Sequence, residues 1–268
     1  MTALNAIQER IRELKFHQSL IAVRRLRKSL ADTYPSMLLR LSRRKRDALV
    51  SEFKRCTTVE DCIEFTRRHM AAGSCQIPWE IESAIKLIAS KRPRTICEIG
   101  TFDAGTSLLF CRFVQTLEAV LCIDLYVKNK EILKLLAPST QRLQFFDMPS
   151  YSPETVNRVE KSLNGRGIDV LFIDGDHRYE GVRQDFLCYR PFVNEGGLIL
   201  FHDIVEDHGA GRAWVGGVPR LWKELSTLYP HTEFINSREQ DGFGIGALTY
   251  LAQVRLPFSQ LGAEEKPQ

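Results

Sequence analysis

The chain has 268 residues, of which 44% are hydrophobic and 26% charged. These proportions are ordinary for a soluble globular protein, and the length allows one large domain or one domain with an extension. No stretch of 18 apolar residues occurs, which excludes a membrane-spanning helix of the usual kind.

The charge is unevenly distributed. The net charge is +4, but residues 1–70 hold 16 Lys and Arg against 8 Asp and Glu, and the remainder holds 21 against 25. A basic N-terminal segment therefore precedes a slightly acidic body, and the two call for separate explanations.

The N-terminal segment reads as a series of basic helices. Apolar residues at three- and four-residue spacing predict a helix over 1–31, and a second basic stretch runs through Leu39–Lys54. Thr57 and Glu60 have capping-box spacing and predict a third helix that ends near Met70. We expect this helical extension to occupy residues 1–72.

After residue 72 the pattern changes. Pro78 suits the first position of a helix that continues to Ser90. Short β-rich runs then alternate with helical ones, which predicts parallel βαβ units in a wound sheet covered on both faces. The expected strands are Thr95–Ile99, Val120–Leu125, Leu143–Phe146, Asp169–Ile173 and Leu198–Phe201, followed by Glu233–Ile235 and Phe243–Leu251.

The last two runs are separated by a short connection, as in an antiparallel hairpin closing a mostly parallel sheet. The fold class is therefore α/β, a Rossmann-like wound sheet with an antiparallel C-terminal hairpin strand, preceded by the helical extension. We expect the domain to span 73–253, its core running from about Pro78 to Leu251, and 254–268 to form a polar tail.

A glycine turn follows the first predicted strand. Gly100 and Gly105 flank it in Glu98-Ile99-Gly100-Thr101-Phe102-Asp103-Ala104-Gly105, and the next strand ends in Asp124. Glycines let a backbone approach a ligand, and a carboxylate at that strand tip can accept hydrogen bonds from a ribose diol. The competing interpretations are tight packing for the glycines and a helix cap for Asp124.

Charged residues end the fourth and fifth predicted strands. Asp174 and His177 lie in Ile173-Asp174-Gly175-Asp176-His177, and His202 and Asp203 follow Leu198–Phe201. Because neighbouring strands lie about 4.8 Å apart, Asp174 and Asp203 could share one cation, with His202 as a nitrogen ligand. Such ligands suit Mg²⁺, Mn²⁺ or Ca²⁺ better than structural zinc. Helix capping is the competing interpretation for His177.

These motifs resemble class I S-adenosylmethionine-dependent methyltransferases. The E-x-G-T turn at 98–101 resembles their motif I, and IDGDHxYEGV with GGxxxxHD resembles the cephalosporin-hydroxylase-like and macrocin-type O-methyltransferase branch, more distantly the catechol and caffeoyl-CoA O-methyltransferases. The likeness covers about residues 76–250. Many relatives have Gly-Gly where this chain has Ala104-Gly105, and Asp-Asn or Glu-Asp where it has His202-Asp203.

The resemblance implies roles for individual residues. The cofactor would be S-adenosylmethionine, bound by Glu98, Gly100, Thr101, Gly105, Asp124, Asp147 and Asp174, with Asp147 near the adenine. A divalent metal, Mg²⁺ or Mn²⁺, would be held by Asp174, His202 and Asp203. His177 would act with Asp174 in catalysis, since it stands where the catechol and caffeoyl enzymes carry a catalytic lysine. A metal lowers the pKa of a bound hydroxyl, and His177 could then remove its proton.

The sequence thus predicts a transferase that O-methylates a small hydroxylated acceptor, such as a sugar or a glycosylated product. Two alternatives stay open: an RNA methyltransferase anchored by the basic helices, and a non-catalytic subunit with the same fold. For Trp214 and the glycines around it we weigh a substrate-covering loop against an ordinary surface crossover.

The basic helices themselves admit a packed or homo-oligomeric face, an anionic membrane surface, or nucleic acid, the last least favoured because no RNA-binding module is recognisable. The seven cysteines form no Cys-x-x-Cys pair, and their odd number without a secretion signal argues against a disulfide framework. We therefore expect a cytoplasmic protein, with peripheral membrane association as the alternative.

Overall fold

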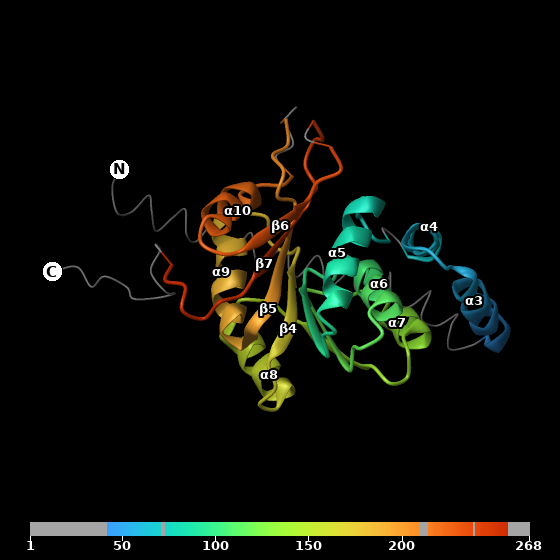
Figure 1. Cartoon of the computed structure of the whole chain (residues 1–268). Coiled ribbons are helices and arrows are strands. Elements are labelled where there is room, and N and C mark those ends of the chain that lie inside the picture. Colours follow the sequence, from blue (N-terminus) through green and yellow to red (C-terminus); the bar gives the residue numbers. More distant parts are fainter. Residues whose placement is uncertain (1–41, 71–72, 209–213, 238, 257–268) are drawn as a thin grey trace, which may run out of the picture. The chain divides into compact units, whose positions relative to one another are not determined.

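The computed structural model describes residues 42–70, 73–208, 214–237 and 239–256 (Figure 1). The helix expected over 1–31 and most of the expected tail lie outside these ranges, so the oligomer, membrane and nucleic-acid interpretations of the basic segment stay predictions. The chain divides into two units, 1–49 and 50–268. Of the first unit the structure describes residues 42–49, which begin helix α3 (Arg43–Arg55). This basic helix confirms the second of the three expected N-terminal helices.

Helix α4 (Val59–His69) begins one residue later than the capping-box spacing predicted. Thr58, not Thr57, is the N-cap: its Oγ1 accepts a hydrogen bond from the Asp61 amide at 3.0 Å, and the Asp61 carboxylate accepts one from the Thr58 amide at 3.0 Å. The prediction of Thr57 and Glu60 was wrong because the cap at Thr58 places Val59 and Ile63 on the buried face. The expected domain boundary at residue 73 stays a prediction.

The sheet has seven strands in the order β3-β2-β1-β4-β5-β7-β6. β1 to β5 run parallel, while β7 pairs antiparallel with both β5 and β6. The expected mostly parallel sheet closed by an antiparallel hairpin strand is thereby confirmed. The strands are β1 (Thr95–Ile99), β2 (Ala119–Asp124), β3 (Arg142–Asp147), β4 (Ile168–Ile173), β5 (Val193–His202), β6 (His231–Phe234) and β7 (Ile245–Thr249).

Helices cover both faces of this sheet, because its central strands are apolar on both sides and need shielding from water. Helices α5, α6 and α7 lie over one face and α8, α9 and α10 over the other (Figure 1). Their bounds are α5 (Pro78–Ser90), α6 (Gly105–Phe113), α7 (Lys130–Leu136), α8 (Pro153–Leu163), α9 (Tyr179–Tyr189), which continues into the short 3₁₀ helix η1 (Arg190–Phe192), and α10 (Val218–Ser226).

Strand register brings the predicted site residues to one edge of the sheet. Ile99 of β1 is level with Ile173 of β4, which is level with Phe201 of β5. The residues that follow, Gly100, Asp174 and His202, therefore leave the sheet side by side at the carboxyl ends of their strands.

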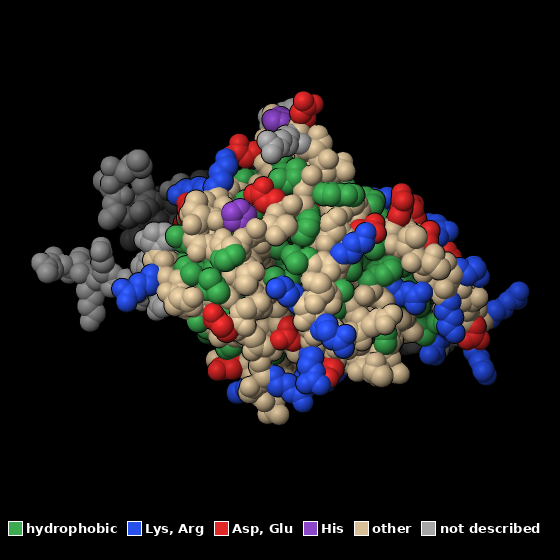
Figure 2. Space-filling view, in the orientation of Figure 1, with side chains coloured by type: hydrophobic (Ala, Val, Ile, Leu, Met, Phe, Trp, Pro, Cys, Tyr) green, Lys and Arg blue, Asp and Glu red, His purple; other side chains and the backbone are tan. Residues whose placement is uncertain are grey.

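On the face drawn in Figure 2, hydrophobic side chains stand in separate groups between charged ones. Within the described part of the chain, no helix combines the length and the apolar character needed to cross a membrane.

Candidate functional site

The glycine turn packs directly against the strand beside it. Gly100 has φ +88°, and a Cβ built there would lie 1.8 Å from the main-chain oxygen of Asp174. Only glycine can therefore bring the end of β1 this close to the end of β4. The Gly100 and Thr101 amides both donate to the Ile123 carbonyl, at 2.8 and 3.1 Å, so the turn is anchored to β2 as well.

Gly105 is closely packed, as the competing interpretation of the glycines expected. A Cβ at this position would lie 2.4 Å from the Ser74 amide nitrogen, so the chain segment before α5 occupies the space beside the start of α6. Ala104, the N-cap of α6, has φ +62°, a left-handed conformation that costs an L-residue about 1 kcal/mol or more. Tight packing thus explains Gly105, and its role toward a cofactor stays a prediction.

Glu98 faces inward from β1. It is 1% exposed and accepts a hydrogen bond from the Ser107 hydroxyl. Burial raises the pKa of Glu98 to about 8, although the Ser107 hydrogen bond opposes this rise. Glu98 therefore stabilises the first turn of α6 through Ser107. Direct contact between Glu98 and a cofactor stays a prediction.

The two acidic residues at the ends of β2 and β3 stand level in the sheet. Asp124 accepts hydrogen bonds from the amides of Phe102 and Tyr126, each at 2.9 Å, so its carboxylate ties the glycine turn to the end of β2. Asp147 accepts one from the Val127 amide at 3.0 Å and pairs with Lys130. The role of Asp124 toward a ribose stays a prediction.

The carboxylate tips of β4 and β5 come together as the sequence predicted. One ligand atom each from Asp174, His177 and Asp203 can be chosen so that all three lie within 4.8 Å of one another. The Nε2 atom of His177 lies 3.5 Å from Asp174 Oδ1 and 3.5 Å from Asp203 Oδ2. His177 therefore completes the group of potential metal ligands, a position for which the sequence had suggested His202.

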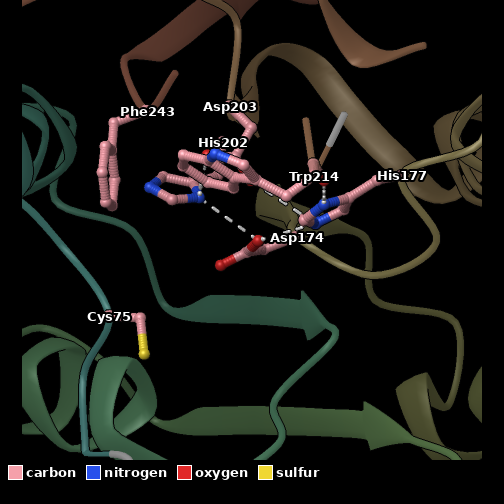
Figure 3. Close-up of a pocket in the computed structure, with 7 residues that line it drawn as sticks. All are labelled: Cys75, Asp174, His177, His202, Asp203, Trp214 and Phe243. Carbon is pink, nitrogen blue, oxygen red and sulfur yellow. Dashed lines mark hydrogen bonds and ion pairs between the residues drawn. The ribbon is translucent and has the colours of Figure 1, made fainter. Parts of the chain in front are cut away.

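His202 lies on the buried side of this group. Its Nδ1 atom is 3.3 Å from Asp174 Oδ1 and 3.2 Å from Asp203 Oδ1, but neither ring nitrogen makes a well-aligned hydrogen bond within the described residues. Figure 3 shows both imidazoles directed at Asp174 from different sides. The role of His202 as a metal ligand stays a prediction.

Electrostatics hold the two carboxylates and two imidazoles together. Burial by itself would raise the pKa of Asp174, but His202 and His177 outweigh it and keep that pKa well below its usual range. Burial lowers the pKa of His177, yet Asp174 and Asp203 together raise it to about 9. The site therefore gathers positive charge around its carboxylates.

The tautomer of His177 follows from its second hydrogen bond. Its Nδ1 atom lies 2.6 Å from the main-chain oxygen of Trp214, which can only accept, so Nδ1 carries a proton. In the neutral ring this leaves the Nε2 lone pair directed at Asp174 and Asp203, ready for a cation or a proton.

Backbone strain marks the site. Asp203 has φ +65° and Phe243 has φ +60°, and Phe102 and Ala104 of the glycine turn are also left-handed. Four of the seven non-glycine residues with positive φ in the described part of the chain thus surround one edge of the sheet. Such conformations cost about 1–3 kcal/mol each and cluster at functional sites.

A cavity of about 320 Å³ opens onto this group, and Figure 3 shows the residues around it. Asp174, His177, His202 and Asp203 form its polar side. Cys75, Trp214 and Phe243 form the rest, with the Trp214 and Phe243 rings meeting edge to face at 4.8 Å between centroids. Sequence reasoning proposed Trp214 for this role but missed Cys75 and Phe243.

Two further buried polar residues beside the cavity were missed. Gln76 donates to Asp174, and Glu80 accepts hydrogen bonds from the amides of Asn236 and Gly244, at 3.0 and 2.9 Å, on either side of the loop that carries Phe243. Gln76 and Glu80 both lie near the start of α5. Their hydrogen-bond partners are about 100 or more positions away in the sequence, so no motif spacing could have identified these contacts.

Comparison with known proteins decides the family of this domain. Residues 97–204 match a family model described as a methyltransferase domain. The segment that carries the glycine turn and the Asp174 and Asp203 tips is thus similar to a methyltransferase domain. The predicted resemblance is confirmed at this level, and the particular branch of O-methyltransferases stays a prediction.

Two curated relatives of the methyltransferase domain are themselves uncharacterized. A protein of Acanthamoeba polyphaga mimivirus is 29% identical over 148 residues, which are 52% of this chain and 65% of that protein. A protein of Sinorhizobium fredii is 29% identical over 160 residues, 55% of this chain and 17% of that protein. The chain thus spans less than two thirds of either relative.

Solved structures confirm the fold. An O-methyltransferase from Bacillus cereus in complex with SAH superposes with a TM-score of 0.51 and 16% identity, covering 82% of this chain and 97% of that one. At this identity the likeness establishes the Rossmann-like methyltransferase fold, and the residues of this chain must carry any argument about its substrate.

Proposed function

We propose that the protein is an S-adenosylmethionine-dependent methyltransferase that methylates a hydroxyl of a small acceptor with the help of a divalent cation. The observation that carries this proposal is the meeting of the Asp174, His177 and Asp203 group with the Gly100 turn at one sheet edge of a methyltransferase domain. A scaffold would have no need for charged groups gathered around a cavity.

The donor set fits a hard divalent cation such as Mg²⁺ or Mn²⁺. Two carboxylates and one imidazole converge, and Asp203 Oδ1 is buried without a hydrogen-bond partner in the described residues. Asp174, His177 and Asp203 would hold the ion. When bound, such an ion lowers the pKa of a coordinated hydroxyl, and S-adenosylmethionine supplies the methyl group.

The chain's own residues would orient the two reactants. The backbone at Gly100 and the carboxylate of Asp124 would hold the cofactor, with Asp147 near its adenine end. The Trp214 carbonyl fixes the His177 ring, so that its Nε2 atom faces Asp174 and Asp203, where the ion would lie. Without a cation, the pKa of about 9 keeps this imidazole protonated at neutral pH, so His177 could act as the general base predicted from the sequence only near or above pH 9.

The size and walls of the cavity support a small acceptor. A volume of about 320 Å³ lies at the lower end of ligand pockets. The Trp214 and Phe243 rings, which meet edge to face, offer apolar contact surface in the same cavity as the charged group. A hydroxylated ring, such as a sugar, would place its apolar face on the aromatic rings and a hydroxyl toward Asp203.

Calorimetric titration tests the proposal. S-adenosylmethionine is titrated into metal-stripped protein, then with Mg²⁺ or Mn²⁺ present, and again with Asp203→Ala. We expect cofactor binding in wild type and a separate metal signal that is lost in the variant. Asp176→Ala is the matched control, since this carboxylate pairs with Arg178 at 2.6 Å instead of joining the group. Failure of wild type to bind the cofactor would overturn the proposal.

A further inference from the structure

A short strap of residues, Gly73 to Gln76, crosses the beginning of α6. The Ser74 amide donates to Thr66 Oγ1 of α4 at 3.0 Å, and the Ser74 hydroxyl lies 3.3 Å from Thr106 Oγ1 of α6. The missing Cβ of Gly105 lets the strap lie against the α6 backbone. Because the strap is held from both sides, the position of Gln76 is fixed by the backbone.

The Gln76 side chain extends from this strap to the charged group. It is 3% exposed, and its Nε2 atom donates to Asp174 Oδ2 at 3.3 Å. The other oxygen of Asp174 is the one that faces His177 and His202. Since an ionised carboxylate can only accept, Asp174 requires the amide nitrogen of Gln76 on its side and directs the Gln76 carbonyl away.

That carbonyl oxygen is unsatisfied. Oε1 of Gln76 is buried and has no hydrogen-bond partner within the residues described. A buried acceptor without a donor costs about 1–3 kcal/mol, and such groups in native proteins usually have a partner. Gln76 does not itself line the cavity, but the adjacent Cys75 and the bonded Asp174 both do, so a ligand bound there lies beside the Gln76 side chain.

The surroundings of this oxygen select the kind of donor. The Gln76 carbonyl oxygen is a neutral acceptor, and the negatively charged Asp174 carboxylate is close to it. This combination favours a cationic N–H donor over a neutral one. The Gly100 turn touches the Asp174 backbone, so a ligand lying on that turn would place its end group close to Gln76.

We propose that Gln76 is a positioning and binding residue whose amide N–H orients Asp174 and whose carbonyl accepts a hydrogen bond from the α-ammonium of the S-adenosylmethionine amino-acid end. This inference rests on the proposed function and adds to it. Binding of the amino-acid end and the orientation of Asp174 are then coupled through one side chain.

Two ligands that differ at the amino-acid end test the proposal by calorimetry. S-adenosylhomocysteine carries this end, and 5′-methylthioadenosine lacks it. In Gln76→Leu we expect S-adenosylhomocysteine to bind about tenfold more weakly, as for the loss of one charge-assisted hydrogen bond. The affinity for 5′-methylthioadenosine should stay within about twofold. Gln76→Glu, which keeps an acceptor, should bind S-adenosylhomocysteine more tightly than Gln76→Leu.

Gln141→Leu is the matched control. Gln141 is also buried with an unpartnered carbonyl oxygen, but its amide donates to Cys111, and neither its chain neighbours nor Cys111 line the cavity. This variant should change neither affinity. Equal losses for both ligands in Gln76→Leu, or no loss for either, would overturn the inference while leaving the proposed function intact. Wild-type protein that binds neither ligand would overturn both.

Discussion

Replacing Asp185 with asparagine should make the protein more stable, by an amount that grows with pH. Asp185 lies on α9 and is fully buried. One oxygen accepts a hydrogen bond from the Ser150 hydroxyl at 2.5 Å, while the other has no partner among the described residues and lies 3.4 Å from a Cβ built on Gly175. Burial raises the pKa of Asp185 to about 7, against the opposing effect of the Ser150 hydrogen bond.

The magnitude follows from proton linkage. The unfolded chain releases the Asp185 proton near its ordinary pKa of 3.8, whereas the native protein retains it to about 7. Between these values the native state binds more protons, so the unfolding free energy falls as pH rises. At about 1.4 kcal/mol per pKa unit, the total loss is about 4 kcal/mol, complete above about pH 7.

Asparagine has the same shape and no charge to lose, so Asp185→Asn avoids this pH-dependent cost. Urea denaturation followed by circular dichroism should show nearly equal stability at about pH 4 and a variant about 4 kcal/mol more stable at about pH 8. Asp61→Asn gives the opposite sign, because amide hydrogen bonds from Thr58 and Thr57 lower the pKa of Asp61. A difference for Asp185→Asn that does not change with pH would refute the reasoning.

Three further substitutions test the site. Trp214→Ala should raise the acceptor KM about tenfold and leave cofactor affinity unchanged. Trp79→Ala removes an exposed tryptophan outside the cavity lining and should change neither quantity. If both variants change the acceptor KM equally, Trp214 lies outside the acceptor site. Asp203→Asn should weaken Mn²⁺ binding by more than about tenfold without loss of thermal stability, because asparagine tolerates the left-handed backbone; an unchanged Mn²⁺ titration would exclude Asp203 as a ligand. Gly100→Ala should lower the unfolding free energy by about 3 kcal/mol or more, since its Cβ would meet Asp174; a urea midpoint like that of wild type would contradict this.

Periodicity and turn chemistry were sufficient to predict the sheet. Alternating apolar runs located the strands to within a few residues, and because parallel strands end at one edge, the meeting of Asp174 with Asp203 could be predicted from topology. The capping box shows the limit of spacing rules. Thr57 and Thr58 are both chemically able to cap α4, and burial of Val59 decides between them.

Side-chain direction could not be predicted. The sequence offered His177 and His202 as candidates, and assigned the first to proton transfer and the second to the metal. Their geometry depends on the Trp214 carbonyl, which fixes one ring, and on the inward direction of His202 at the end of β5. Gln76 could not be found at all, since its contact with Asp174 spans 98 residues and depends on a strap with no regular structure.

Of the seven residues that line the cavity, four lie within the segment that matches the family model and three lie outside it. The family match covers residues 97–204, which include the glycine turn and the Asp174 and Asp203 tips. Gln76, Glu80, Trp214 and Phe243 fall before or after it. Glu80 accepts hydrogen bonds from the Gly244 amide at 2.9 Å and the Gln240 side chain at 2.7 Å, and so holds the Phe243 loop against the start of α5. The matched segment can therefore indicate a methyltransferase domain, while acceptor choice must also depend on cavity residues outside that segment.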